Sequence, residues 1–190
     1  AVHLFDGLNY SRAIGVVPAL DFDKQADIIK KLEKLLPSID SNSFEDVLGK
    51  FNEVSGLKIH NFQTQNVESA EVIYVTHGSL ESELFIDAVK NSSQSNVGVI
   101  AVRVPLPFNV EKFTAVIPKT AKKIVVIGQS LTGDSSSLLK SRVSAALFYS
   151  NRRDIQVSEY LYKPDFVWSP AAIKQIIETF SPVDTISIGE

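Results

Sequence analysis

Four apolar runs rich in Val and Ile, each followed by a helical pattern, fill most of the chain between residues 71 and 180. The runs are continuous rather than alternating, as in strands of a sheet that is covered on both faces. The alternation therefore predicts an α/β fold, with a three-layer, mostly parallel sheet. The expected pairs of strand and helix are 71–77 with 79–90, 97–104 with 109–117, 122–128 with 136–150, and 155–162 with 169–180.

Polar residues at the expected helix starts support these boundaries. Asn109 and Ser169 are suited to cap the helices that follow them, and Pro170 suits the first helical position.

The first part of the chain has a different pattern. It contains an apolar strand over 1–5, a helix over 23–36, and a second helix over 43–54 with Ser43 as its N-cap. Gly56 is expected to end that helix, and residues 56–62 to form a short strand. We therefore predict that residues 1–56 are the tail of a preceding domain plus a helical connector. Residues 57–190 would form the main α/β domain.

Charge and composition exclude several classes of function. The net charge is -3, so the chain offers no basic surface for nucleic acid. No apolar run approaches the roughly 20 residues of a membrane helix. The chain has no Cys, which excludes disulfides, iron–sulfur clusters and Cys nucleophiles and suits a reducing, cytoplasmic location. It also has no Met and opens in an apolar run, so we expect a segment of a longer protein.

The turn after the first run of the alternation is a candidate phosphate site. A strand, a Gly turn and a helix N-terminus form the arrangement that binds phosphates in many nucleotide-binding proteins. Gly78 and Ser79 are therefore candidates for cofactor binding. However, the turn has one Gly and no nearby Lys, and Glu81 and Glu83 would repel an anion. The favoured interpretation is a tight turn closed by a Ser cap.

A second candidate lies at residues 130–135. Ser130, Thr132 and Gly133 resemble the Ser/Thr-rich FMN phosphate loop of flavodoxins, although Asp134 is a poor neighbour for an anion. The same stretch nearly matches a G-x-S-x-G nucleophile elbow, but every His precedes Ser130, whereas that fold needs one after it. The favoured interpretation is a flexible surface loop.

No metal or catalytic site is predicted. The three His are far apart, and the paired carboxylates fall on expected helix starts or polar faces. The residues alone therefore indicate an α/β domain without a convincing active site.

Several longer motifs, taken together, resemble a known family. The motifs are FDGLNYS (5–11), THGSLESELF (76–85), VGVIAVRVPLPFNVEKF (97–113), KKIVVIGQS (122–130) and VSAALFY (143–149), together with SEYLYKPDFVWSP (158–170). The first five resemble the middle region of pyruvate:ferredoxin oxidoreductases, where a transketolase-C-terminal-like domain follows the tail of a thiamine domain. The set that includes SEYLYKPDFVWSP is more similar still to the fungal version of this region, in the N-terminal half of the flavoprotein (alpha) subunits of assimilatory NADPH-sulfite reductases.

The resemblance implies a non-catalytic scaffold or docking segment. FAD, FMN and NADPH are implied for the parent enzyme, in modules beyond residue 190, and no cofactor for this segment. The implied partners are a sirohaem-containing beta subunit and neighbouring domains of the same chain. Two alternatives remain open: a domain of a thiamine-dependent 2-oxoacid:ferredoxin oxidoreductase, and an FMN-binding flavodoxin-like domain. Thiamine enzymes carry a G-D-G…N motif and a charged stretch after Phe-Asp-Gly, and this chain has neither.

The stretch YLYKPDFVWSP carries aromatic residues at every second position. Tyr160, Tyr162, Pro164, Phe166 and Trp168 would share one face of an extended chain. The favoured interpretation is that this stripe covers the domain's own core, and the alternative is that part of it docks a partner.

Overall fold

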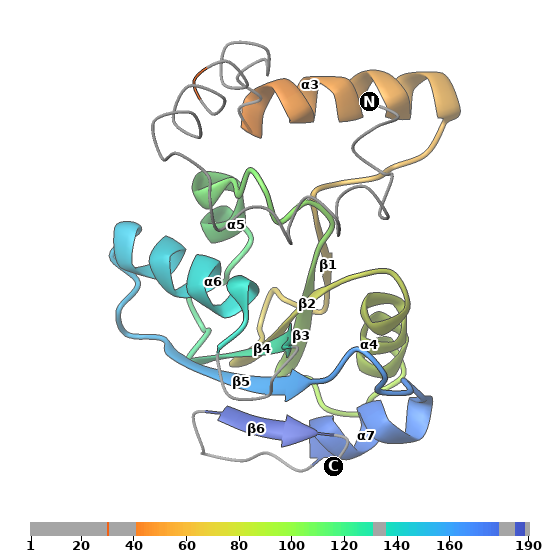
Figure 1. The fold of residues 1–190 in the computed structure, drawn as a ribbon, viewed down its shortest axis with the longest axis vertical. Helices are drawn as coiled ribbons and strands as arrows, with labels where there is room; N and C mark the ends of the chain where they lie inside the picture. The colour runs from red at the N-terminus through yellow and green to blue at the C-terminus, as the bar shows by residue number, and fades with distance from the viewer. Residues whose placement is uncertain (1–29, 31–40, 131–135, 179–184, 189–190) are drawn as a thin grey trace, which may run out of the picture. The chain divides into compact units, whose positions relative to one another are not determined.

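The computed structural model describes residue 30 and residues 41–130, 136–178 and 185–188 (Figure 1). Contacts divide the chain into two units, Ala1–Ile39 and Asp40–Glu190. Lys30 is the one described residue of the first unit, so the predicted elements at 1–5 and 23–36 lie outside the described residues. The boundary that we placed between residues 56 and 57 stays a prediction.

The second unit alternates strands and helices along the chain. Its elements are α3 (Ser41–Ser55), β1 (Phe62–Gln65), β2 (Val72–His77), α4 (Leu80–Lys90), β3 (Val97–Val102), α5 (Val110–Ala115), β4 (Lys123–Gln129), α6 (Leu138–Tyr149), β5 (Gln156–Tyr162), α7 (Pro170–Glu178) and β6 (Thr185–Ile188).

The strands form one six-stranded sheet in the order β1-β3-β2-β4-β5-β6. Strand β1 pairs antiparallel with β3, and every other neighbouring pair is parallel. All six residues of β3 are buried, as expected for a strand covered on both faces. The predicted mostly parallel α/β sheet is confirmed.

Helices cover both faces of the sheet, which confirms the three layers (Figure 1). On one face Phe113 of α5 and Val143 of α6 pack in a core with Ile124 of β4. On the other face Phe85 of α4 and Ile173 of α7 pack in a second core, which includes the Tyr160 side chain of β5. None of the helices in the described ranges is long and apolar enough to cross a membrane.

The strand β6 was not expected from the sequence. It extends the sheet beyond β5, with Tyr160 opposite Ile186. The connections β4–α6–β5 and β5–α7–β6 run in the same direction across the sheet, but α6 and α7 lie on opposite faces. The two crossovers therefore have opposite hands, although parallel crossovers are nearly always right-handed.

The predicted boundaries around α3 were partly wrong. The helix begins at Ser41, so Ser43 lies inside it rather than at its N-cap. Gly56 ends it as expected, with a φ of 71° and its N–H bonded to the Asn52 carbonyl at 2.9 Å. The predicted strand at 56–62 is instead a connection to β1. The Asn52 side chain both donates to and accepts from the backbone of Ile59, at 2.7 and 3.0 Å, and so replaces strand pairing there.

The predicted caps of two later helices are confirmed. The Asn109 side chain accepts a hydrogen bond from the Lys112 N–H at 3.0 Å, at the start of α5. The Ser169 hydroxyl accepts one from the Ala172 N–H at 3.2 Å, at the start of α7.

A candidate pocket at the carboxyl edge of the sheet

The carboxyl ends of β2, β4 and β5 meet around a cavity of about 330 Å³. This edge is where open α/β sheets bind ligands. The residues that matter for its chemistry are His77 and Gly78 after β2, Gln129 of β4, Tyr162 of β5, and Glu81 and Ser137 at the starts of α4 and α6. A larger cavity, of about 640 Å³, lies between α4 and α7, away from the strand ends.

The turn after β2 holds a carboxylate of the chain itself. Gly78 has a φ of 109°, and a Cβ built on it would overlap the Glu81 carboxylate. Glu81 Oε1 accepts a hydrogen bond from the Tyr162 hydroxyl at 2.7 Å, which ties the first turn of α4 to the end of β5. A phosphate placed at this turn would meet that negative charge.

Tyr162 contributes a neutral hydroxyl to the pocket. Its pKa is raised, first because the ring is buried and second because the phenol donates to the Glu81 carboxylate. The pair therefore presents a carboxyl group and a phenolic hydroxyl to the pocket.

Ser79 occupies the N-cap position of α4, but its side chain makes no cap hydrogen bond. Its backbone is helical, with φ and ψ of -92° and -56°, whereas a capping Ser adopts extended values. The predicted Ser cap is thus wrong. The predicted acidic first turn, Glu81 and Glu83, is confirmed.

The N-terminus of α6 faces a second carboxylate, from Glu159 of β5. Glu159 is 1% exposed, and its Oε1 accepts hydrogen bonds from the Ser137 N–H at 3.1 Å and from the Ser137 hydroxyl. Lys140 Nζ lies 3.9 Å from Glu159 Oε2. The positive end of a helix and a nearby ammonium group stabilise a buried carboxylate.

Gly128 makes room for this arrangement. A Cβ built on it would overlap Glu159 Oε1 and Ser137 Oγ. Sequence reasoning missed the cluster because Glu159 lies inside an apolar strand pattern and Gly128 inside another. A charged residue in a buried strand and a Gly in the neighbouring strand were the available signals.

The predicted cofactor-binding candidates are only partly placed by the structure. Gly78 and Ser79 follow β2, and Ser130 follows β4, so these three lie at the same edge of the sheet. Ser130 is buried, and its N–H donates to the Tyr162 carbonyl at 3.0 Å. Thr132 and Gly133 lie outside the described residues.

Donor groups suit this pocket better than anions do. Glu81 supplies a carboxylate acceptor, and Glu159 already takes the hydrogen bonds that the Ser137 N–H and hydroxyl would offer to an anion. His77 is fixed by a 2.9 Å hydrogen bond between its Nδ1 and the Val102 carbonyl. Within the part of the chain that the structure describes, no three His, Cys, Asp or Glu residues are grouped as metal ligands.

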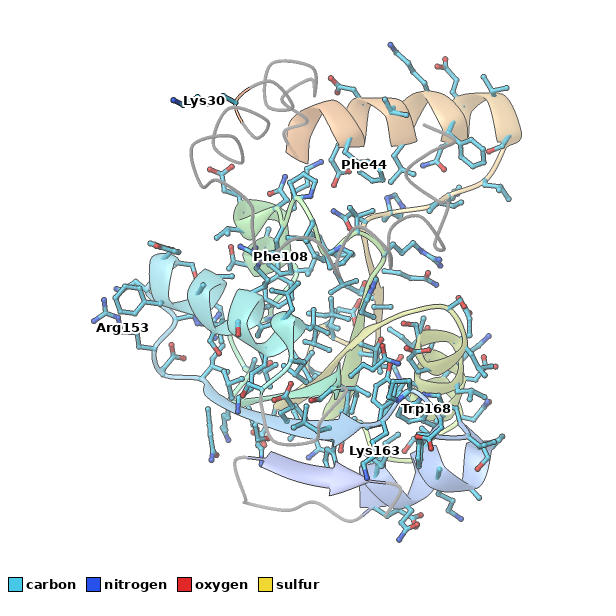
Figure 2. All side chains as sticks on the ribbon, viewed as in Figure 1. Lys30, Phe44, Phe108, Arg153, Lys163 and Trp168 are labelled. Carbon is cyan, nitrogen blue, oxygen red and sulfur yellow. The ribbon has the colours of Figure 1, made fainter. Side chains whose placement is uncertain are left out.

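Phe166 and Trp168, which follow β5, pack against the domain's own core (Trp168 is labelled in Figure 2). The Trp168 ring lies 4.8 Å from both Tyr162 and Phe166, and 6.1 Å from Phe85 of α4, measured between ring centroids. Pro164 is exposed, so the predicted stripe does not include it. The reason is that β5 ends at Tyr162 and the strict alternation ends there too.

Comparison with known proteins shows that the chain is similar to a part of two longer proteins. No family model matches it. It is 53% identical over 182 residues to the "Sulfite reductase [NADPH] flavoprotein component" of Saccharomyces cerevisiae, which covers 96% of this chain and 17% of that protein. It is 31% identical over 113 residues to the "Pyruvate dehydrogenase [NADP(+)]" of Cryptosporidium parvum. That match covers 53% of this chain and 6% of that protein.

A solved 2-oxoglutarate:ferredoxin oxidoreductase from Magnetococcus marinus is 17% identical, with a TM-score of 0.44, and the match covers 75% of this chain and 24% of that one. The chain spans about a sixth of the length of its yeast relative. The resemblance of its motifs is confirmed: this chain is homologous to one region of the flavoprotein component of sulfite reductase.

Proposed function

We propose that this chain is a non-catalytic scaffold and docking segment of the flavoprotein subunit of an assimilatory NADPH-sulfite reductase. The observation that carries the proposal is the 53% identity to the yeast flavoprotein component across 96% of the chain. The parent enzyme would pass electrons from NADPH through FAD and FMN to a sirohaem-containing beta subunit, in the cytoplasm. The flavins and NADPH would bind in other modules of the same protein.

The carboxyl edge of the sheet supports a role without an anionic cofactor. The two helix N-termini at the pocket each lie beside a carboxylate of the chain, Glu81 at α4 and Glu159 at α6. FMN, FAD, NADPH and thiamine diphosphate all carry phosphates, which these carboxylates would repel.

Calorimetric titration of the chain with each of these four cofactors tests the non-catalytic part of the proposal. We expect no binding in the micromolar range. Micromolar binding of any one of them would contradict it, and Glu81→Gln would then show whether the carboxyl edge is the site.

Deletion of this segment from the longer flavoprotein tests the docking part. We expect NADPH-dependent reduction of a soluble artificial acceptor to continue, because the flavin modules would be intact. Binding to the partner subunit should weaken. If the truncated flavoprotein bound its partner as tightly as the intact one, the docking role would be wrong.

A second candidate is a domain that supports a thiamine-dependent 2-oxoacid oxidoreductase. The 31% identity to the Cryptosporidium parvum pyruvate dehydrogenase over 113 residues favours it. Binding of thiamine diphosphate to the longer protein, lost on deletion of this segment, would support this candidate over the first.

A further inference from the structure

The C-terminal end of α6 exposes two adjacent aromatic side chains. Phe148 is 55% exposed and Tyr149 is 78% exposed. The helix already packs on the sheet through its opposite face, with Leu139, Val143, Ala146 and Leu147 buried. The two rings therefore add nothing to the core, and neighbouring exposed aromatic side chains are typical of interaction surfaces.

The backbone that follows the helix folds one arginine back over this pair. Asn151 has a φ of 59°, its N–H donates to the Phe148 carbonyl at 3.3 Å, and the Arg152 N–H donates to the Leu147 carbonyl at 2.9 Å. These two hydrogen bonds form a Schellman motif, which ends the helix and turns the chain. The Arg153 guanidinium then lies 4.2 Å from the centre of the Phe148 ring. Figure 2 shows Arg153 at the outer end of α6.

We define the arginine–aromatic patch as Arg142, Phe148, Tyr149 and Arg153. Three of its members contact one another: the Phe148 and Tyr149 rings are 5.9 Å apart, edge to face, and Arg153 covers Phe148. Arg142 lies seven residues before Tyr149, two turns along the same helix, and is exposed. Aromatic and arginine side chains are enriched among the residues that contribute most to binding. Contacts that hold such side chains in place before binding reduce the entropy cost of docking.

The charge of this region is opposite to that of the chain. Residues 138–154 contain four basic side chains and one acidic side chain, in a chain of net charge -3. The one acidic side chain, Asp154, pairs with Arg152. No acidic side chain among the described residues forms a salt bridge with Arg142 or Arg153. The patch thus presents two guanidinium groups to solvent beside two aromatic rings.

We propose that the arginine–aromatic patch docks an acidic surface of the partner subunit, with Phe148 and Tyr149 inserted as apolar anchors. The inference rests on the proposed docking function and names its surface. Charge complementarity favours an acidic partner. It disfavours a second copy of this chain through the same patch, because a two-fold interface would bring four arginines together.

The affinity of the intact flavoprotein for its partner subunit, measured by surface plasmon resonance at low and high salt, tests this. Phe148→Ser with Tyr149→Ser should weaken binding at least about 10-fold, the effect of losing a modest hot spot. Arg142→Glu with Arg153→Glu should slow association and reduce its dependence on salt, because the steering charge is reversed.

Matched controls come from exposed residues elsewhere. Val167→Ser removes an apolar side chain that is 81% exposed, in the segment between β5 and α7. Lys58→Glu with Lys90→Glu reverses two exposed charges outside the patch. Both controls should change the affinity less than about twofold, as is usual for residues outside a hot spot. Circular dichroism should confirm that every variant is folded. If the aromatic double variant did not fold, the double variant Arg142→Glu with Arg153→Glu, which changes two exposed side chains, would decide alone.

The outcomes separate this inference from the proposed function. Full affinity in every patch variant, with affinity lost on deletion of the whole segment, would overturn the patch but leave the docking function standing. Full affinity after that deletion would contradict the docking function itself. If the patch variants instead released a neighbouring module to proteolysis while partner affinity was unchanged, the assignment of the occupant would be wrong.

Discussion

The Tyr162 hydroxyl donates a 2.7 Å hydrogen bond to Glu81 Oε1, and this bond joins the end of β5 to the first turn of α4. One strand, β4, lies between β5 and β2, the strand that precedes α4, because β4 pairs with both. The bond therefore crosses the end of β4 at the carboxyl edge of the sheet, where ligands of such folds bind. The predictions below test this arrangement and its surroundings.

Gly78 should be required for the fold rather than for chemistry. Its φ of 109° is strained for any other residue, and a side chain there would displace the Glu81 carboxylate. We expect Gly78→Val to cost about 1–3 kcal/mol of unfolding free energy. Glu81→Gln should cost about 1 kcal/mol or less. Urea unfolding measures both changes.

Gly49 offers a matched control for this prediction. It lies inside α3, and a Cβ built on it meets nothing within 4 Å. Gly49→Ala should therefore stabilise the helix by up to about 1 kcal/mol. An unmoved urea midpoint in Gly78→Val would show that the turn tolerates a side chain and that our account of it is wrong.

Gly128 and Glu159 should be energetically coupled. We expect Gly128→Ala alone to cost about 1–3 kcal/mol, because the added methyl group overlaps Glu159 Oε1 and Ser137 Oγ. In a Glu159→Ala background part of that space is free, so the same substitution should cost less. A double-mutant cycle on urea unfolding measures the coupling. Strictly additive effects would mean that the carboxylate does not restrict position 128.

Stability should fall at high pH through two tyrosines. Burial raises the pKa of Tyr74, and burial together with the Glu81 carboxylate raises that of Tyr162. An unfolded tyrosine titrates near pH 10. Above that pH the folded state thus binds more protons than the unfolded state. The contribution of the two tyrosines to the unfolding free energy is therefore complete below about pH 10 and is lost as the pH rises further.

Thermal unfolding followed between pH 8 and 11 measures this loss. Tyr162→Phe should reduce the dependence on pH in this range, and so should Tyr74→Phe. An unchanged pH dependence in both variants would contradict the assigned pKa shifts.

Local patterns predicted the layers of this fold better than its edges. Continuous Val and Ile runs located β2 to β5, and Asn109 and Ser169 located two helix starts, because burial and capping each favour particular residue types within a short stretch of sequence. Strand β6 has four residues, too few for such a pattern, and it is defined by its pairing with β5. The Glu81–Tyr162 bond joins residues 81 positions apart, which no spacing in the sequence indicates.

Trp168 should report a buried aromatic cluster. It is the only Trp of the chain, it is half-buried, and its ring contacts Tyr162, Phe166 and Phe85 edge to face or nearly so. We expect blue-shifted emission and weak quenching by acrylamide. Phe166→Ala should shift the emission to the red, because it removes a ring 4.8 Å away. Val167→Ala, at an 81% exposed position between the two, should not. Red-shifted, freely quenched emission from the unmodified chain would overturn the assignment of Trp168 to the core. If the emission then shifted to the blue when the partner subunit was added, the cluster would be a docking surface.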